Sequence, residues 1–129
     1  MSNQLADATY VSFATFRKTG AAVPTPVWCA EDGGDFYIFS AGNAGKVKRL
    51  RNSDRAQMAV CDVRGKVLGE WHSARATTIS DPAEIEQALR ALREKYGLQM
   101  WLADVGAKLT GRFHKRAYIR ARLTEALSG

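Results

Sequence analysis

The residues best suited to chemistry in this chain lie in one short stretch, Gly45-Lys46-Val47-Lys48-Arg49-Leu50-Arg51. Val47 and Leu50 are three apart, so on a helix both face the same neighbour, and Lys46 and Arg49 then share one side and Lys48 and Arg51 another. The turn over residues 42–45 contains two glycines and exposes backbone N–H groups, which favour an anion. On charge alone, four bases also fit an ordinary solvated face. The spacing nevertheless indicates a site for one phosphate, held by Lys46 and Arg49.

Other familiar sites are absent from the sequence pattern. The basic stretch lacks the spacing of an ATP-binding P-loop, and no carboxylate that could hold magnesium accompanies it. Cys29 and Cys61 lie far in sequence from His72 and His114 and match no metal-ligand spacing. We therefore expect no metal site, and no disulfide in a reducing compartment.

The charge of the chain suggests an anionic partner. Its 19 Lys and Arg residues exceed its 13 Asp and Glu residues, giving a net charge of +6. The excess is uneven, since residues 1–42 sum to -2 and residues 43–129 sum to +8. Such a balance fits nucleic acid, a membrane surface or a phosphorylated small molecule, and composition does not choose among them.

Length and hydropathy set the remaining bounds. A chain of 129 residues, 46% hydrophobic and 25% charged, is typical of one globular domain, here residues 1–129, and not of a disordered protein. No strongly apolar run exceeds four residues, against the roughly 20 needed to cross a bilayer. The opening ten residues show no basic segment followed by an apolar one, so a secretory signal is not expected. We expect a cytoplasmic protein that does not span a membrane.

The first half of the sequence reads as strands. Residues 10–17, 23–30 and 35–41 form a predicted meander of three strands, separated by turns that contain glycine. Pro24 and Pro26 cannot donate to a ladder, so one side of the second strand must be unpaired. A ligand could lie against that open side.

The second half mixes strands with helices. A short basic helix is expected at 46–51, strands at 55–63 and 67–79, and a helical hairpin over 82–111 that starts after Asp81-Pro82 and turns at Gly97. The second helix carries a predicted core face of Leu98, Trp101 or Leu102, Val105 and Leu109. A last strand, 116–123, alternates small and apolar residues inward with Tyr118 and arginines outward. Six strands with these helices predict an α+β, mainly β domain built on an antiparallel sheet or barrel.

Several motifs follow one another in a recognisable order. They are Thr15-Phe16-Arg17-Lys18-Thr19-Gly20, Pro24-Thr25-Pro26-Val27-Trp28, Phe39-Ser40-Ala41, the basic stretch 45–51, Cys61-Asp62, Arg64-Gly65 and Gly69-Glu70-Trp71. This order resembles the pyridoxamine 5'-phosphate oxidase-like superfamily, and within it the flavin and deazaflavin (coenzyme F420) oxidoreductase branch. The resemblance runs from about residue 10 to residue 96, with a looser fit through the last strand.

The resemblance implies a split β-barrel that forms a homodimer with two cofactor sites between its subunits. It implies FMN or coenzyme F420 as cofactor, with hydride passing between the reduced cofactor and a small-molecule acceptor. The residues that it implies are Thr25, Pro26, Val27 and Trp28 along the ring, Ser40, Lys46 and Arg49 at the phosphate, Lys48 and Arg51 at a longer anionic tail, and Glu70 and Trp71 of the partner subunit. Relatives carry Ser or Thr where this chain has Ala44, so one phosphate donor is missing.

Three alternatives stay open at this stage. The barrel could bind FMN, or a tetrapyrrole such as haem, without turning over a deazaflavin. A basic barrel that binds nucleic acid is disfavoured, because the aromatic residues of the first strands do not interleave with bases. No general acid or base is assigned, and Glu70, His72 and Tyr118 are the candidates.

Overall fold

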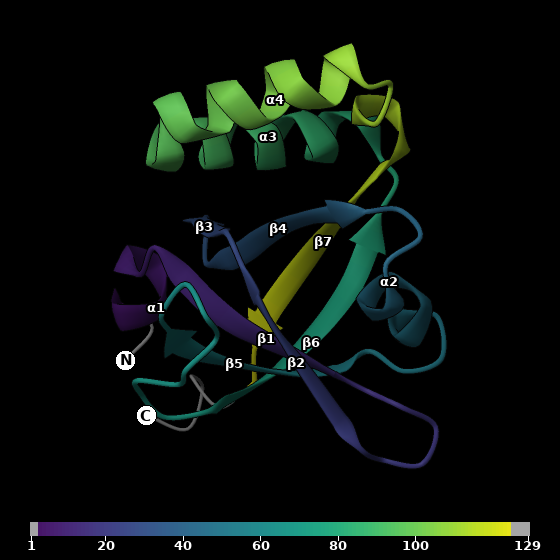
Figure 1. Ribbon diagram of the computed structural model, residues 1–129. Helices are drawn as coiled ribbons and strands as arrows, with labels where there is room; N and C mark the ends of the chain where they lie inside the picture. Colours follow the sequence, from purple (N-terminus) through teal and green to yellow (C-terminus); the bar gives the residue numbers. More distant parts are fainter. Residues whose placement is uncertain (1–2, 125–129) are drawn as a thin grey trace.

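The computed structural model describes residues 3–124 (Figure 1). Seven strands form one sheet: β1 (Tyr10–Phe16), β2 (Ala22–Val27), β3 (Cys29–Asp32), β4 (Asp35–Ala41), β5 (Arg55–Cys61), β6 (His72–Ile79) and β7 (Arg116–Leu123). The helices are α1 (Asn3–Asp7), α2 (Gly45–Leu50), α3 (Pro82–Tyr96) and α4 (Leu98–Leu109), with a 3-10 turn, η1 (Phe113–Lys115). The predicted α+β class is confirmed, and the expected count of six strands is wrong.

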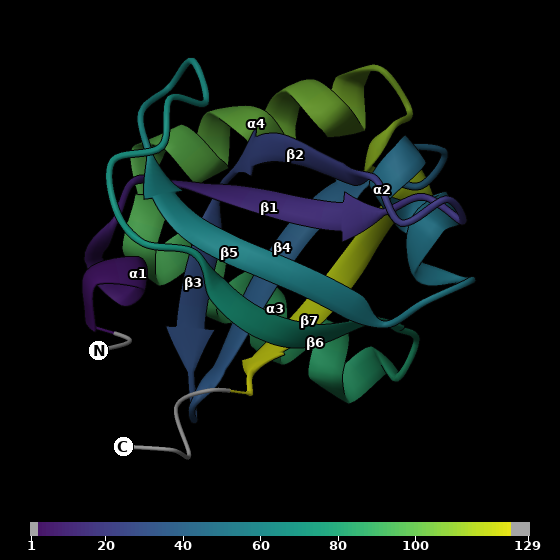
Figure 2. The same cartoon turned by 90° about the horizontal axis from the view of Figure 1, so that it is seen from below.

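The sheet is antiparallel and curled, with the strand order β2-β1-β5-β6-β7-β4-β3 (Figure 2). Its two edge strands, β2 and β3, are consecutive in the chain and joined by Trp28 alone. A single residue can link opposite edges only if the sheet curls until those edges approach each other. The fold is therefore consistent with a split barrel.

The additional strand comes from the segment 23–30, which was expected to be one strand. The structure divides it at Trp28 into β2, which pairs with β1, and β3, which pairs with β4. Within the part of the chain that the structure describes, β2 has no second neighbour in the sheet. This agrees with the reading of Pro24 and Pro26, because neither residue has the N–H that a second partner would need.

The expected bent strand over 67–79 is also corrected. β6 begins only at His72, and the preceding segment, 62–71, is a loop fixed to β5 by a bridge between Cys61 and Val67. Gly65 takes a φ of +91° there, which closes the tight turn after Asp62. Glu70 and Trp71 therefore lie on a loop, and both are exposed.

The barrel interior is a single apolar core. Its fully buried side chains include Phe13, Phe36, Met58 and Ile119, contributed by four different strands. Val47 of α2 is buried and Leu50 packs against this core, so the two residues seat the helix as their spacing predicted.

The helical hairpin covers the β3–β4–β7 part of the sheet (Figure 1). Asp81 caps α3 by accepting from the Ala83 N–H, and Gly97 ends the helix with a φ of +53°. The Tyr96 hydroxyl accepts from the Cys29 N–H at 2.9 Å and donates to the Thr9 carbonyl at 2.8 Å. This one hydroxyl ties the end of α3 to the barrel, and its burial raises the pKa of Tyr96.

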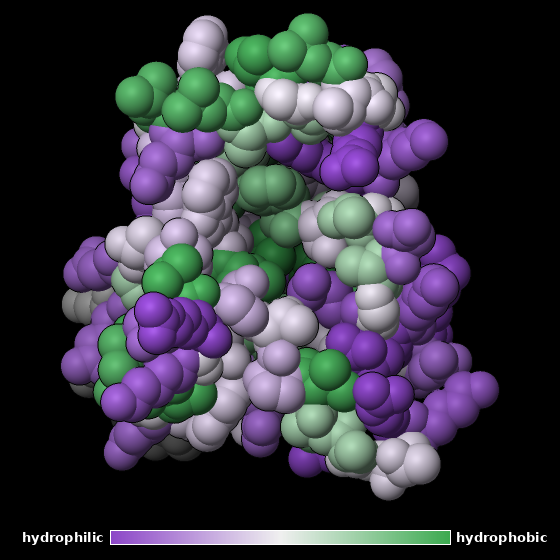
Figure 3. Space-filling view, viewed as in Figure 1, coloured by the Kyte–Doolittle hydropathy of each residue, from purple (hydrophilic) through white to green (hydrophobic). Residues whose placement is uncertain are grey.

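The hairpin changes the expected exposure of two faces. Tyr118, expected to point to solvent, is only 6% exposed because α3 covers it together with Tyr37 and Ala88. On α4 the buried residues are Met100 and Asp104, whereas the face expected to form the core is exposed apart from the partly buried Val105, with Trp101 at 59% and Leu109 at 82%. Figure 3 shows the apolar surface that results over α4.

No helix within residues 3–124 is long and apolar enough to span a membrane.

Candidate functional site

The loop between β4 and α2 is held against the C-terminal part of the chain. The Gly42 N–H donates to the Lys115 carbonyl at 2.8 Å, and a Cβ on Gly42 would overlap that carbonyl oxygen. Only glycine allows this approach. The contact joins Gly42 to Lys115, 73 residues later (115 − 42), and brings the turn over residues 42–45 beside η1, a neighbour that the sequence pattern did not predict.

Two cations of α2, Lys46 and Arg49, lie partly buried next to this loop. The Arg49 Nε donates to the buried Thr15 hydroxyl at 2.6 Å, which fixes the guanidinium against β1. Burial, and then the charge of Arg49, lower the pKa of Lys46. Burial and the neighbouring Arg17 lower the pKa of Arg49 in the same way. Because burial and neighbouring cations disfavour the charges of Lys46 and Arg49, an anion bound beside them would be stabilising.

No carboxylate in the described part of the chain pairs with Lys46 or Arg49. The reason is partly in the sequence, because residues 36–53 contain no Asp or Glu. Lys48 and Arg51 are exposed, in keeping with their expected place on the other side of α2. The helix has only six residues, and Ala44 at its N-cap makes no side-chain hydrogen bond. An anion bound here would therefore be stabilised by the charge of Lys46 and Arg49 rather than by a helix dipole.

The four residues expected to lie along the cofactor ring, Thr25 to Trp28, differ in their environment. Thr25 is partly buried, and its hydroxyl oxygen is buried without a hydrogen-bond partner among the described residues. Pro26 is exposed beside the turn at Gly65, and Val27 points into the barrel core. Trp28 stacks on Tyr96, with ring centroids 4.8 Å apart and planes 14° apart. Trp28 thus packs between barrel and hairpin, and Thr25 is the polar group that β2 leaves unsatisfied.

Ser40 lies at the rim of a cavity of about 700 Å³ between β4, the loop after it and the C-terminal half of α4. Figure 3 shows the surface hollowed beneath the hairpin. The cavity is lined by Phe39, Ser40, Ala41, Gly42, Asn43, Ala107, Arg112, Lys115 and Arg116. Its three basic residues were not singled out from the sequence. Their spacing within five residues was the available signal, but nothing local indicated that they face the turn at 42–45.

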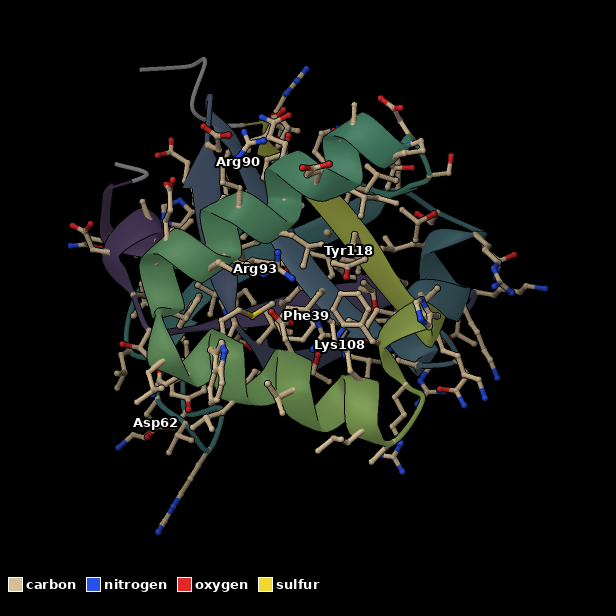
Figure 4. The ribbon with its side chains drawn as sticks, turned by 90° about the horizontal axis from the view of Figure 1, so that it is seen from above. Phe39, Asp62, Arg90, Arg93, Lys108 and Tyr118 are labelled. Atoms are coloured by element: carbon tan, nitrogen blue, oxygen red, sulfur yellow. The ribbon has the colours of Figure 1, made fainter. Side chains whose placement is uncertain are left out.

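Asp104 organises the inner wall of this cavity. Its carboxylate accepts from Arg116 at 2.7 Å and from Arg93 at 2.9 Å, and the guanidinium of Arg116 lies 4.5 Å from the centre of the Phe39 ring. Asp104 and Arg116 have side chains only 8% and 7% exposed. Figure 4 shows Arg93 and Phe39 between the two helices of the hairpin. This cluster holds the hairpin on the barrel and leaves the charge of Arg116 already compensated.

The candidate acids and bases are not brought together. Glu70 lies on the exposed loop 62–71, His72 begins β6, and Tyr118 is buried beneath α3. None of the three lines the cavity. Among residues 3–124, no three His, Cys, Asp or Glu side chains are grouped as a metal site would require.

The comparisons with known proteins agree with this architecture. A sequence profile of the family described as pyridoxamine 5'-phosphate oxidase matches residues 1–127. No curated protein matches the chain.

Solved structures with the same fold carry different functional descriptions. HutZ, the heme storage protein from Vibrio cholerae, is 10% identical with a TM-score of 0.68, over 92% of this chain and 83% of that one. An F420 reductase is 17% identical with a TM-score of 0.59, over 95% and 92%. A conserved hypothetical protein from Mycobacterium tuberculosis is 16% identical with a TM-score of 0.66, over 95% and 80%. At these identities the likeness shows a common fold.

Proposed function

Because the chain belongs to the pyridoxamine 5'-phosphate oxidase family, we propose that it is a flavin- or deazaflavin-dependent oxidoreductase whose single domain binds FMN or coenzyme F420. The observation that carries the proposal is the pair Lys46 and Arg49, two partly buried cations with no carboxylate partner in the described chain. A phosphate between them would compensate both charges. We assign them to the phosphate of the cofactor.

The residues at the open edge of the barrel fit a cofactor ring. The buried hydroxyl of Thr25 lacks a partner within residues 3–124, and an orphaned polar group of this kind costs about 1–3 kcal/mol. Rotation of the Thr25 side chain towards the open edge would let the polar edge of a flavin or deazaflavin satisfy this hydroxyl. Among the described strands, none pairs with the outer side of β2. Thr25, Pro26, Val27 and Trp28 are therefore proposed as the ring-binding strand, with Ser40 near the phosphate.

When bound, such a cofactor supplies the redox chemistry, a hydride exchanged at its central ring with a small-molecule acceptor. The protein binds and orients it. Lys46 and Arg49 hold the phosphate, Lys48 and Arg51 are available to a longer anionic tail, and Glu70 and Trp71 of the partner subunit complete the site. No residue is assigned as the proton donor.

Titration of the purified protein with each cofactor tests the proposal. We expect FMN or coenzyme F420 to bind with a change in its visible absorption, and riboflavin, which has no phosphate, to bind more weakly. Failure of both phosphorylated cofactors to bind would overturn the proposal. Binding of single-stranded nucleic acid with a steep dependence on salt would instead favour a nucleic-acid-binding barrel.

A tetrapyrrole is the second candidate for the same fold. The observation that favours it is His114, an exposed residue of η1 between Arg112 and Lys115, which both line the cavity. An imidazole can ligate haem iron, and cations can hold its propionates. A Soret band that appears on adding haem and is lost in His114→Ala, together with no binding of flavins, would support the tetrapyrrole-binding function.

We expect a homodimer in solution. Large apolar side chains are exposed on α4 and on the loop 62–71, including Leu102 at 57% and Leu68 at 62%. Exposed apolar surface of this extent is typical of an interface, and the proposed site needs Glu70 and Trp71 of a second subunit. Sedimentation at micromolar concentration should give twice the chain mass of 14.2 kDa. A stable monomer would contradict the expectation.

Ala44→Ser is expected to tighten FMN binding by about 0.5–1.5 kcal/mol, the net value of one added hydrogen bond. Ala44 is the N-cap of α2, in an extended conformation with no side-chain cap. A serine there can accept from a helix N–H and still donate its O–H to phosphate.

Titration of the Ala44→Ser variant with FMN and with riboflavin separates these two effects. Riboflavin should gain nothing, because it has no phosphate, whereas the thermal stability of the unliganded protein should rise through the cap. Equal gains for both ligands, or weaker binding of both, would mean that the loop does not contact the phosphate.

A further inference from the structure

The junction between β2 and β3 is the single residue Trp28, which belongs to neither strand. β2 pairs with β1 and β3 pairs with β4, so the chain passes from one edge of the sheet to the other at Trp28. No strand among those described pairs with the outer side of β2 or of β3. The position of Trp28 therefore depends on what packs against it rather than on strand pairing.

The backbone beside this junction is held by the last turn of α3. The Cys29 N–H donates to the Tyr96 hydroxyl at 2.9 Å, and the Cys29 carbonyl accepts from the Lys95 Nζ at 2.5 Å. The same Tyr96 hydroxyl donates to the Thr9 carbonyl, directly before β1, at 2.8 Å. Because buried backbone groups need hydrogen-bond partners, these side chains of α3 take the place of a neighbouring strand at the crossover.

The indole of Trp28 is held by two aromatic rings. It stacks on the Tyr96 ring, with centroids 4.8 Å and planes 14° apart. Phe39 meets it edge-on, with centroids 6.0 Å and planes 64° apart. Trp28 is nevertheless only partly buried. The two rings therefore fix the orientation of the indole and leave part of its surface accessible.

Tyr96 is itself a firm support. Its side chain is buried in a cluster with Leu92 and Met100, and Tyr96 is only 7% exposed. Burial raises the pKa of Tyr96, so the hydroxyl keeps its proton, and its hydrogen bond to Thr9, at neutral and mildly alkaline pH. The stack on Trp28 is thus built on a side chain that packing and hydrogen bonds both restrain.

We propose that Tyr96 is a positioning residue for the cofactor, because its ring fixes the indole of Trp28 against which the cofactor ring is held. The identity of that ligand rests on the proposed function, whereas the orientation of Trp28 by Tyr96 stands on the contacts between the two side chains. Tyr96 acts through Trp28. A wall that is already ordered loses less side-chain freedom when a ligand binds, so the stack contributes to affinity.

Titration of Tyr96→Leu and Tyr96→Phe with FMN and with coenzyme F420 tests the proposal. Tyr96→Leu removes the stack and should weaken binding of both cofactors by about two- to tenfold, the range expected for one aromatic pair. Tyr96→Phe keeps the ring and should recover most of the affinity and the visible spectrum of the bound cofactor. If Tyr96→Leu does not fold, Tyr96→Met takes its place, since an unbranched side chain fills the space more readily and cannot stack.

The indole N–H resonance of Trp28, identified by its absence in Trp28→Phe, reports the orientation of the indole separately from affinity. It should shift in Tyr96→Leu, which has no ring beside the indole, and return in Tyr96→Phe. A general loss of stability would not produce this pattern.

Tyr37→Leu is the matched control. Tyr37 is a second buried tyrosine between the sheet and α3, where it packs with Ala88 and Tyr118, and the ring contacts of Trp28 in the described chain do not include it. This variant should lose stability but keep the Trp28 resonance and the affinity for both cofactors. Equal losses of affinity in Tyr37→Leu and Tyr96→Leu, or an unmoved Trp28 resonance in Tyr96→Leu, would overturn the proposal.

The two proposals fail in different ways. If both cofactors bind Tyr96→Leu as tightly as they bind the wild-type chain, the proposed function stands and the positioning role of Tyr96 is overturned. If neither cofactor binds the wild-type chain, the proposed function fails, and the Trp28 resonance still decides whether Tyr96 orients the indole.

Discussion

Replacement of Lys46 by alanine is expected to weaken binding of FMN and of coenzyme F420 by ten- to a hundredfold. Lys46 is partly buried, has no carboxylate partner within the described residues, and has its pKa lowered by burial and by Arg49. A charge-assisted hydrogen bond to phosphate is typically worth about 1.5–3 kcal/mol. Binding of the phosphate would raise the pKa of Lys46 again, so the affinity of the wild-type chain should fall at alkaline pH as this amine loses its proton.

The control for this variant is Lys48→Ala on the same helix. Lys48 is exposed, so its removal changes the net charge equally without emptying the proposed phosphate site. The Lys48→Ala variant should lose less than about threefold in affinity for FMN, which has no long tail, because a screened surface charge contributes little. Unchanged affinity of Lys46→Ala for both cofactors, or equal losses of FMN affinity in the two variants, would place the phosphate elsewhere.

Asp104→Ala is expected to lower the free energy of unfolding by about 3–5 kcal/mol, because it leaves the buried Arg116 guanidinium without a carboxylate. The side chain of Arg116 is only 7% exposed, so water cannot replace the lost partner. Arg93, 46% exposed, can be solvated instead. Urea denaturation followed by circular dichroism measures the change.

Asp54→Ala is the matched control, since it also breaks an Arg–Asp pair. Arg75 and Asp54 are 64% and 59% exposed, and such surface pairs contribute about 0–1 kcal/mol. A loss in Asp104→Ala no larger than that in Asp54→Ala would show that the hairpin is not held on the barrel through this cluster.

Local pattern predicted most of the secondary structure. Residues 35–41 and 116–123 form strands with the expected bounds, and α3 starts after Asp81 and ends at Gly97. Each of these elements carries its own signal, either alternation or a cap. The loop 62–71 carried a misleading signal, because apolar residues that resemble a strand are held there by one bridge and a glycine turn.

The orientation of α4 shows where periodicity stops being informative. Leu98, Trp101, Leu102 and Leu109 form an apolar face at helical spacing, yet the structure buries Met100 and Asp104 instead. Periodicity shows that a face is apolar but not which surface it will meet. Here the carboxylate of Asp104, shared by Arg93 and Arg116, turns the opposite face towards the barrel.

For the candidate site, the sequence by itself determined the basic helix, its seating through Val47 and Leu50, and the open side of the proline strand, because neighbours in the chain specify all three. Only the tertiary structure decided that Arg112 and Lys115 lie beside the loop 42–45 and that Lys46 and Arg49 have no acid partner within residues 3–124. The physical reason is that the compensation of a charge, and the walls of a cavity, depend on segments distant in sequence. Those segments meet only when the sheet curls and the hairpin closes over it.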